Sequence, residues 1–157
     1  MKTNRTAELS RRAIFGAAAA TAAALTQFRI RDATAQSTIE QPARDAPEAY
    51  IERAFELRRQ AVDSGDQAYG ATVVKDGRII GQSQSLVVIN DDATAHAEMS
   101  AIRDAARRVG RAGLRGATLY SSSRPCPMCE AAAFWAGLDG FHFGRGIEAG
   151  GAPRLCG

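Results

Sequence analysis

Two short stretches decide the fold and the chemistry of this chain: His96-Ala97-Glu98 and Pro125-Cys126-Pro127-Met128-Cys129. Together they offer one imidazole, two thiols and one carboxylate. Catalytic zinc sites use three protein ligands and keep the fourth tetrahedral position open. The candidate ligands of Zn²⁺ are therefore His96, Cys126 and Cys129, and Glu98 is left over as the candidate acid/base beside a metal-bound water.

The spacing of these residues places the site at the beginnings of two helices. Proline suits the first turn of a helix, so a helix over 125–136 would carry Cys126 and Cys129 on one face. His96 and Glu98 are two apart and do not share a helix face. They can converge only where a helix begins, which predicts a helix start at about Thr94.

The two motifs match the H-x-E…P-C-x-x-C signature, and the chain resembles the zinc-dependent cytidine/deoxycytidylate deaminase superfamily. The segments DATAHAE (92–98) and RPCPMC (124–129) are most similar to the nucleoside deaminase branch of this superfamily, which contains guanine and tRNA adenosine deaminases. The likeness runs from about Glu48 to Gly144. It implies a three-layer α/β/α sandwich with a mixed sheet, a zinc cofactor, and hydrolytic deamination of a nucleobase or nucleoside with Glu98 as proton shuttle.

The resemblance favours a purine such as guanine as substrate, without naming the residues that bind it. The chain departs from the family at Ser85, where an Asn is common, and at Arg124, where a Glu is common. It also ends soon after the expected fourth strand, where relatives continue with a helix and a strand. The alternative is a C-terminally shortened remnant or zinc-binding module with little turnover. A tRNA adenosine deaminase is a lesser alternative, and the family resemblance also implies a homodimer.

Residues 1–35 resemble a signal peptide of the twin-arginine type. Ser10-Arg11-Arg12 precedes an alanine-rich apolar run over 13–25, and Ala33-Thr34-Ala35 is a small-x-small cleavage site. Gln36 would then begin a single deaminase domain over 36–157, without a membrane segment. The expected location is periplasmic or secreted, or cytoplasmic if residues 1–35 belong to the fold instead.

The basic character of the chain belongs to its first 35 residues. They hold six of the 20 Lys and Arg residues and two of the 17 Asp and Glu residues, which leaves 14 against 15 in 36–157. A domain with a net charge of −1 lacks the overall positive charge typical of nucleic-acid-binding proteins. The partner predicted from charge is therefore a small molecule, with nucleic acid disfavoured.

Periodicity and turn residues predict the remaining elements. Asp45 and Glu48 resemble a capping box at the start of the first helix. Asp76-Gly77 predicts a two-residue hairpin turn. Residues 86–89 either extend the second strand or form a separate piece. The expected helices cover 47–63, 94–109 and 125–136, the expected strands cover 71–75, 78–83, 117–121 and 140–143, and residues 147–157 are expected to be unstructured.

Three side chains outside the motifs receive structural interpretations. Phe134 and Trp135 are expected in the core, and His142 is expected to be an ordinary strand residue because the metal site is complete without it. Cys156 has no assigned role. The fourth strand, at 140–143, is expected to leave an exposed sheet edge, and such edges invite pairing with another chain.

Overall fold

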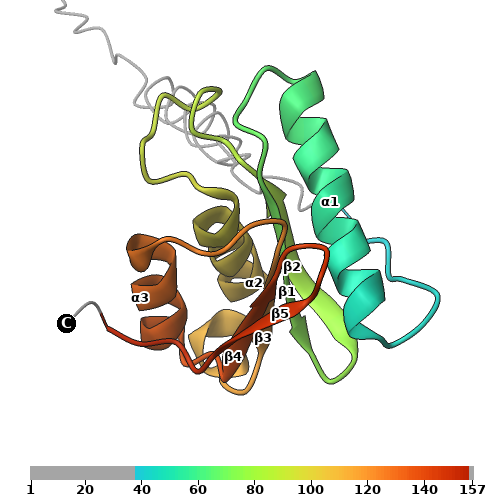
Figure 1. Cartoon of the computed structure of the whole chain (residues 1–157). Coiled ribbons are helices and arrows are strands. Elements are labelled where there is room, and N and C mark those ends of the chain that lie inside the picture. The colour runs from blue at the N-terminus through green and yellow to red at the C-terminus, as the bar shows by residue number, and fades with distance from the viewer. Residues whose placement is uncertain (1–37, 156–157) are drawn as a thin grey trace, which may run out of the picture. The chain divides into compact units, whose positions relative to one another are not determined.

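The computed structural model describes residues 38–155, which form three helices and five strands (Figure 1). The elements follow the chain in this order: α1 (Pro47–Asp63), β1 (Gly70–Lys75), β2 (Arg78–Gln84), α2 (Ala97–Gly113), β3 (Thr118–Ser121), α3 (Pro127–Ala136), β4 (Gly140–Phe143) and β5 (Glu148–Gly151). The predicted order of helices and strands as far as residue 143 is confirmed.

The sheet is mixed and lies between two helical layers. Its strand order is β2-β1-β3-β4-β5, with β3 and β4 parallel and every other neighbouring pair antiparallel. In Figure 1, α1 covers one face of the sheet and α2 and α3 cover the other. This arrangement confirms the expected α/β/α sandwich and puts the beginnings of α2 and α3 near each other.

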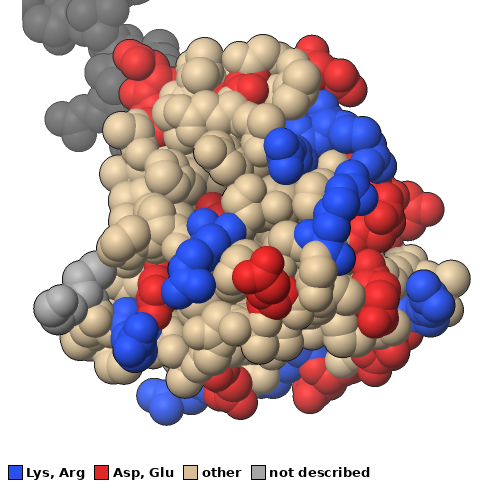
Figure 2. Space-filling view, in the orientation of Figure 1, with Lys and Arg blue, Asp and Glu red and all other residues tan. Residues whose placement is uncertain are grey.

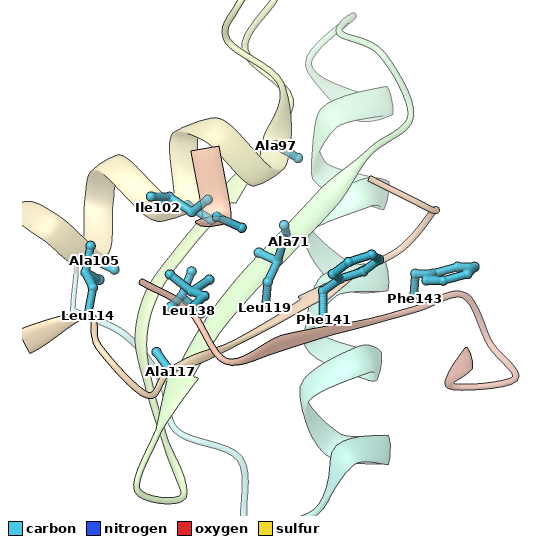
Figure 3. Packing of buried hydrophobic residues seen from close by; sticks show 13 residues of the cluster. Ala71, Ala97, Ile102, Ala105, Leu114, Ala117, Leu119, Leu138, Phe141 and Phe143 are labelled. Atoms are coloured by element: carbon cyan, nitrogen blue, oxygen red, sulfur yellow. The ribbon is translucent and has the colours of Figure 1, made fainter. Parts of the chain in front are cut away.

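Alternation along the strands gives each face of the sheet its own core. Val73 and Leu119 belong to the larger cluster, on the side of α2 and α3, and Figure 3 shows Leu119 beside Phe141. Val74 and Tyr120, one residue further along, join the cluster beneath α1. The larger cluster consists of Ala71, Val73, Ala97, Ala101, Ile102, Ala105, Leu114, Ala117, Leu119, Ala133, Leu138, Phe141 and Phe143.

The hairpin between β1 and β2 has the predicted turn. Asp76 and Gly77 both have positive φ, at 49° and 72°, as a two-residue turn of this kind requires. The outer strand β2 is also contacted by the segment before α1. The side-chain amide of Gln41 donates to the Ile79 carbonyl at 2.9 Å and accepts from the Ile79 N–H at 2.9 Å.

The predicted capping box at α1 is wrong. Ala46 occupies the N-cap and no side chain caps the helix. The Asp45 carboxylate instead accepts a hydrogen bond from the Tyr50 hydroxyl at 2.7 Å, and that hydroxyl also lies 2.8 Å from the Gly77 carbonyl. Asp45 therefore ties the start of α1 to the hairpin turn rather than to its own backbone.

Both helices that carry the motifs begin later than predicted. α2 begins at Ala97, because the Asp92 carboxylate accepts bonds from the Thr94 N–H (2.8 Å) and hydroxyl (2.7 Å) and holds this segment in a turn. α3 begins at Pro127 with Cys126 at its N-cap. Gly110 interrupts α2 with a non-helical backbone, as expected of a helix-ending glycine, but the helix resumes to Gly113.

Residues 87–90 form turns, so the segment over 86–89 does not extend the second strand. The Asp66 carboxylate accepts the N–H groups of Val88 and Ile89, each at 2.9 Å, which replaces the pairing that a strand would have provided.

The end of the described chain is ordered, contrary to the prediction. β5 pairs antiparallel with β4 and so covers the strand that was expected to be an exposed edge. Gly150 allows this approach, since a Cβ there would collide with the ring of Phe141. The prediction for the aromatic pair on α3 is also wrong: Phe134 is 42% exposed and Trp135 is 64% exposed.

Two predictions fall on residues that the structure does not describe. The expected signal peptide over 1–35, with its cleavage before Gln36, lies outside residues 38–155, as does Cys156. Among the residues that are described, none of the helices has the length and apolarity needed to cross a bilayer.

Candidate metal and catalytic site

The structure brings the two motifs together at the N-terminal ends of α2 and α3. His96 is the N-cap residue of α2 and Glu98 lies in its first turn. Cys126 is the N-cap residue of α3 and Cys129 lies in its first turn. Thus the separation of His96 from Glu98 by two residues is accommodated where the chain turns into the helix, as the spacing predicts.

The three candidate ligands form a nearly equilateral triangle. Nδ1 of His96 lies 3.7 Å from Sγ of Cys126 and 3.6 Å from Sγ of Cys129, and the two sulfurs are 3.6 Å apart. A tetrahedral Zn²⁺ with bonds of about 2.3 Å to sulfur and about 2.0–2.1 Å to nitrogen separates two sulfurs by roughly 3.8 Å, and a sulfur from a nitrogen by roughly 3.6 Å. The triangle therefore has the dimensions of three tetrahedral zinc ligands, and these three side chains are positioned to bind a metal.

Cys129 is the most enclosed of the three, with a side chain that is fully buried. Burial raises the pKa of the Cys129 thiol, and the neighbouring Glu98 and Cys126 raise it further. Zinc binds the thiolate and not the thiol. A metal that binds here must therefore displace the Cys129 proton.

Glu98 is buried beside the triangle and is held from two sides. It is 4% exposed, its Oε2 lies 3.6 Å from Sγ of Cys129, and its Oε1 accepts the hydroxyl of Ser121 at 2.7 Å. The carboxylate thus lies next to the ligands without belonging to the triangle. This is the arrangement that a proton-transferring group beside a metal requires.

Ser121 is a residue that the sequence motifs do not include. It is fully buried at the end of β3, four residues before the first proline of the Cys motif. The available signal was a small polar residue closing the apolar strand over 117–121. A polar side chain at the end of a buried strand that leads into a motif points toward the site.

The other residues that the sequence singled out lie around the cluster or apart from it. Ser85 is fully buried, and the next residue, Leu86, donates its N–H to the Ala95 carbonyl beside His96. The guanidinium of Arg124 lies over the Phe143 ring, 5.3 Å from its centroid. His142 stacks on Tyr120 beneath α1, so it behaves as the predicted strand side chain.

Comparison with known proteins agrees with the geometry. Residues 44–145 match the family model described as the cytidine and deoxycytidylate deaminase zinc-binding region. Guanine deaminase from Bacillus subtilis is 43% identical over 90 residues, which cover 57% of this chain and 58% of that protein. Its X-ray structure aligns with a TM-score of 0.58 at 40% identity, over 61% of this chain and 62% of that one.

A tRNA-specific adenosine deaminase from Agrobacterium fabrum is 37% identical over 103 residues, covering 66% of this chain and 68% of that protein. A crystal structure in complex with 2,6-diaminopurine is also similar, with a TM-score of 0.60 at 28% identity over 66% of this chain and 59% of that one. The match spans less than two thirds of the Bacillus guanine deaminase. With about two thirds of its residues matched by the family model and a zinc-sized triangle of ligands, the chain belongs to the zinc-binding cytidine and deoxycytidylate deaminase family.

Proposed function

We propose that this protein is a zinc-dependent hydrolase that removes an amino group from a nucleobase or nucleoside, with a purine such as guanine as its first candidate substrate. The observation that carries the proposal is the triangle of His96, Cys126 and Cys129, with donor atoms 3.6–3.7 Å apart, beside the buried carboxylate of Glu98. Metal ligands alone would serve a structural site equally well. The buried carboxylate beside them is what a hydrolytic site adds.

The proposed reaction replaces a ring amino group by an oxygen from water and releases ammonia. Bound Zn²⁺ supplies the positive charge that makes water a nucleophile at neutral pH. Glu98 would take the two protons of this water in turn, delivering one to the ring nitrogen and the other to the departing amine. One water is consumed and one ammonia leaves, so the carboxylate returns to its starting state.

A purine substrate is supported by the purine specificity that the names of similar proteins state. The Bacillus relative is a guanine deaminase, and a related crystal structure contains 2,6-diaminopurine. The tRNA-specific relative, at a similar identity, keeps a tRNA adenosine as the second candidate. The charge of the domain disfavours a tRNA substrate, because residues 36–157 hold 14 basic and 15 acidic residues. On the face shown in Figure 2, Lys and Arg side chains lie beside Asp and Glu side chains.

The test is ammonia release from zinc-loaded protein with guanine, adenine, cytosine, their nucleosides and an adenosine-containing tRNA anticodon stem-loop. We expect release from guanine, and we expect Glu98→Gln to bind zinc normally while losing about 10²–10⁴-fold in rate. Release from the stem-loop alone would favour the tRNA substrate. Normal turnover by Glu98→Gln would remove Glu98 from the mechanism.

A zinc-binding module with little turnover is the competing proposal. It is motivated by the match to only 58% of the Bacillus enzyme's length. This reading predicts one zinc per chain with no ammonia from any compound in the panel. Measuring zinc content and ammonia on the same sample therefore separates the two proposals.

We also propose that residues 1–35 direct export by the twin-arginine route, on the strength of Arg11-Arg12 and the apolar run that follows them. The expected result is that the full chain reaches the periplasm of a Gram-negative host. Replacing both arginines by lysine should hold it in the cytoplasm. Equal export of the two versions would refute the proposal.

A further inference from the structure

The shortest hydrogen bond to the candidate catalytic carboxylate comes from a residue outside the motifs. The Ser121 hydroxyl donates to Oε1 of Glu98 at 2.7 Å, and both side chains are buried, at 0% and 4% exposure. We propose that Ser121 is a positioning residue, which fixes Glu98 so that Oε2 is the oxygen that exchanges protons. This inference rests on the proposed function, because it assigns a role within the same reaction.

Ser121 is well placed to hold another side chain because its backbone is fixed in the middle of the sheet. It pairs with Ala71 of β1 on one side and with Phe143 of β4 on the other. Its carbonyl accepts the Gly144 N–H at 3.0 Å. A group carried by a central strand keeps its position more accurately than one carried by a loop.

The direction of the Ser121 hydroxyl is set by its neighbour in the chain. The Ser123 N–H points at the Ser121 Oγ from 3.4 Å, a long contact that occupies the acceptor side of the oxygen. A hydroxyl has one proton to donate. With the backbone donor on one side and the carboxylate on the other, that proton is directed to Oε1 of Glu98.

The two oxygens of Glu98 are thereby made different. Oε1 is occupied by the Ser121 hydroxyl, whereas Oε2 lies 3.6 Å from Sγ of Cys129, on the side of the metal ligands. Glutamate has several rotatable bonds, and a catalytic group that is displaced by about 1 Å can cost about 100-fold in rate. The bond to Ser121 keeps Oε2 at the ligands in the absence of any substrate contact.

Ser122 offers a matched control for the test. Its side chain is also buried, at 4% exposure, and its hydroxyl oxygen accepts the Gly70 N–H at 3.1 Å, with no bond to Glu98. Ser121→Ala and Ser122→Ala therefore each remove one buried hydroxyl that accepts a backbone N–H, from Ser123 and from Gly70 respectively. Only Ser121→Ala releases the carboxylate.

We expect Ser121→Ala to lower kcat by about 10–100-fold, the range typical of residues that orient a metal-site group, with KM and zinc content unchanged. Ser121→Thr, which keeps the hydroxyl, should recover most of the rate. Ser122→Ala should keep kcat within about twofold of the unchanged protein. Equal losses in Ser121→Ala and Ser122→Ala, or no loss in Ser121→Ala, would overturn the positioning role.

A spectroscopic measurement tests the contact without turnover. The carboxylate stretch of Glu98 is identified in carboxyl-labelled, zinc-loaded protein as the infrared band that Glu98→Gln removes. We expect Ser121→Ala to shift this band and Ser122→Ala to leave it in place. Should Ser121→Ala fold poorly, the weaker donor in Ser121→Cys provides the same comparison.

The two measurements separate the inference from the proposed function. A band shift in Ser121→Ala together with no ammonia from the unchanged protein would refute the deaminase proposal. It would still support the hydrogen bond by which Ser121 positions Glu98. An unmoved band would overturn the positioning role even if the unchanged protein were fully active.

Discussion

Replacing Cys129 by serine tests the metal site most directly. Cys129 is fully buried, and its Sγ lies 3.6 Å from each of the other two donors, so no other described side chain occupies its corner of the triangle. Zinc sites of four ligands bind with about 10–16 kcal/mol, or roughly 2.5–4 kcal/mol for each ligand if they share equally. At about 1.4 kcal/mol per factor of ten, losing one ligand should weaken zinc binding on the order of 10²–10³-fold.

The assay is competition for zinc against a coloured chelator, with unfolding followed on the same samples. At a free zinc concentration about 1,000 times the dissociation constant, bound zinc adds about 4 kcal/mol to the free energy of unfolding. A 10²–10³-fold weaker site at that concentration adds only about 1 kcal/mol. Cys129→Ser should therefore lose most of the zinc-dependent thermal shift.

Cys156→Ser is the matched control, since it removes the chain's third thiol and leaves the triangle complete. It should bind zinc with unchanged affinity. If Cys129→Ser bound one zinc as tightly as Cys156→Ser, the geometric assignment of the three ligands would be refuted.

Three further predictions concern the scaffold. Burial and the hydrogen bond to Asp45 raise the pKa of Tyr50 to about 12, so tyrosinate absorbance should show a late ionisation. Because the folded state keeps this proton to a higher pH than the unfolded chain, the free energy of unfolding should fall as pH rises from about 10 toward 12. Gly150→Ala should lower the free energy of unfolding by about 1–3 kcal/mol in urea, because its Cβ meets the Phe141 ring. Trp135→Ala, at a position 64% exposed, should change it by less than about 0.5 kcal/mol.

Each of these has its own control. Tyr50→Phe should remove the late ionisation, and its persistence would assign that ionisation to another tyrosine. Gly146→Ala should be nearly neutral, since its Cβ would meet only Cγ of Glu148 at 3.9 Å. Leu119→Ala, at a fully buried position, should cost about 2–5 kcal/mol, and a comparable loss in Trp135→Ala would contradict the exposure of that side chain.

The local sequence was sufficient to predict the structure where a few neighbouring residues determine the backbone conformation. The pair Asp76-Gly77 predicted the hairpin turn, and the run over 71–75 that precedes it predicted the first strand. The motif spacing correctly predicted that His96 and Glu98 would converge where a helix begins, because that argument depends only on helix geometry.

What could not be predicted depends on contacts between distant segments. Asp45 meets Tyr50 and the hairpin turn instead of capping its helix. The glycine-rich β5 has little strand propensity and forms because β4 offers an edge and Gly150 admits the ring of Phe141. Ser121 becomes part of the site only because β3 ends opposite the first turn of α2.

Side chains occupy backbone hydrogen-bonding groups of β2, one of the two edge strands of the sheet. The amide of Gln41 satisfies both backbone groups of Ile79, and the Asp104 carboxylate accepts the Gln82 N–H at 3.1 Å, so two residues of β2 already have partners where an incoming chain would bind. These side chains make hydrogen bonds that a sixth strand would otherwise make with β2. Gln41 and Asp104 together discourage aggregation through this edge, and Gln41→Ala would expose the backbone groups of Ile79 to intermolecular pairing.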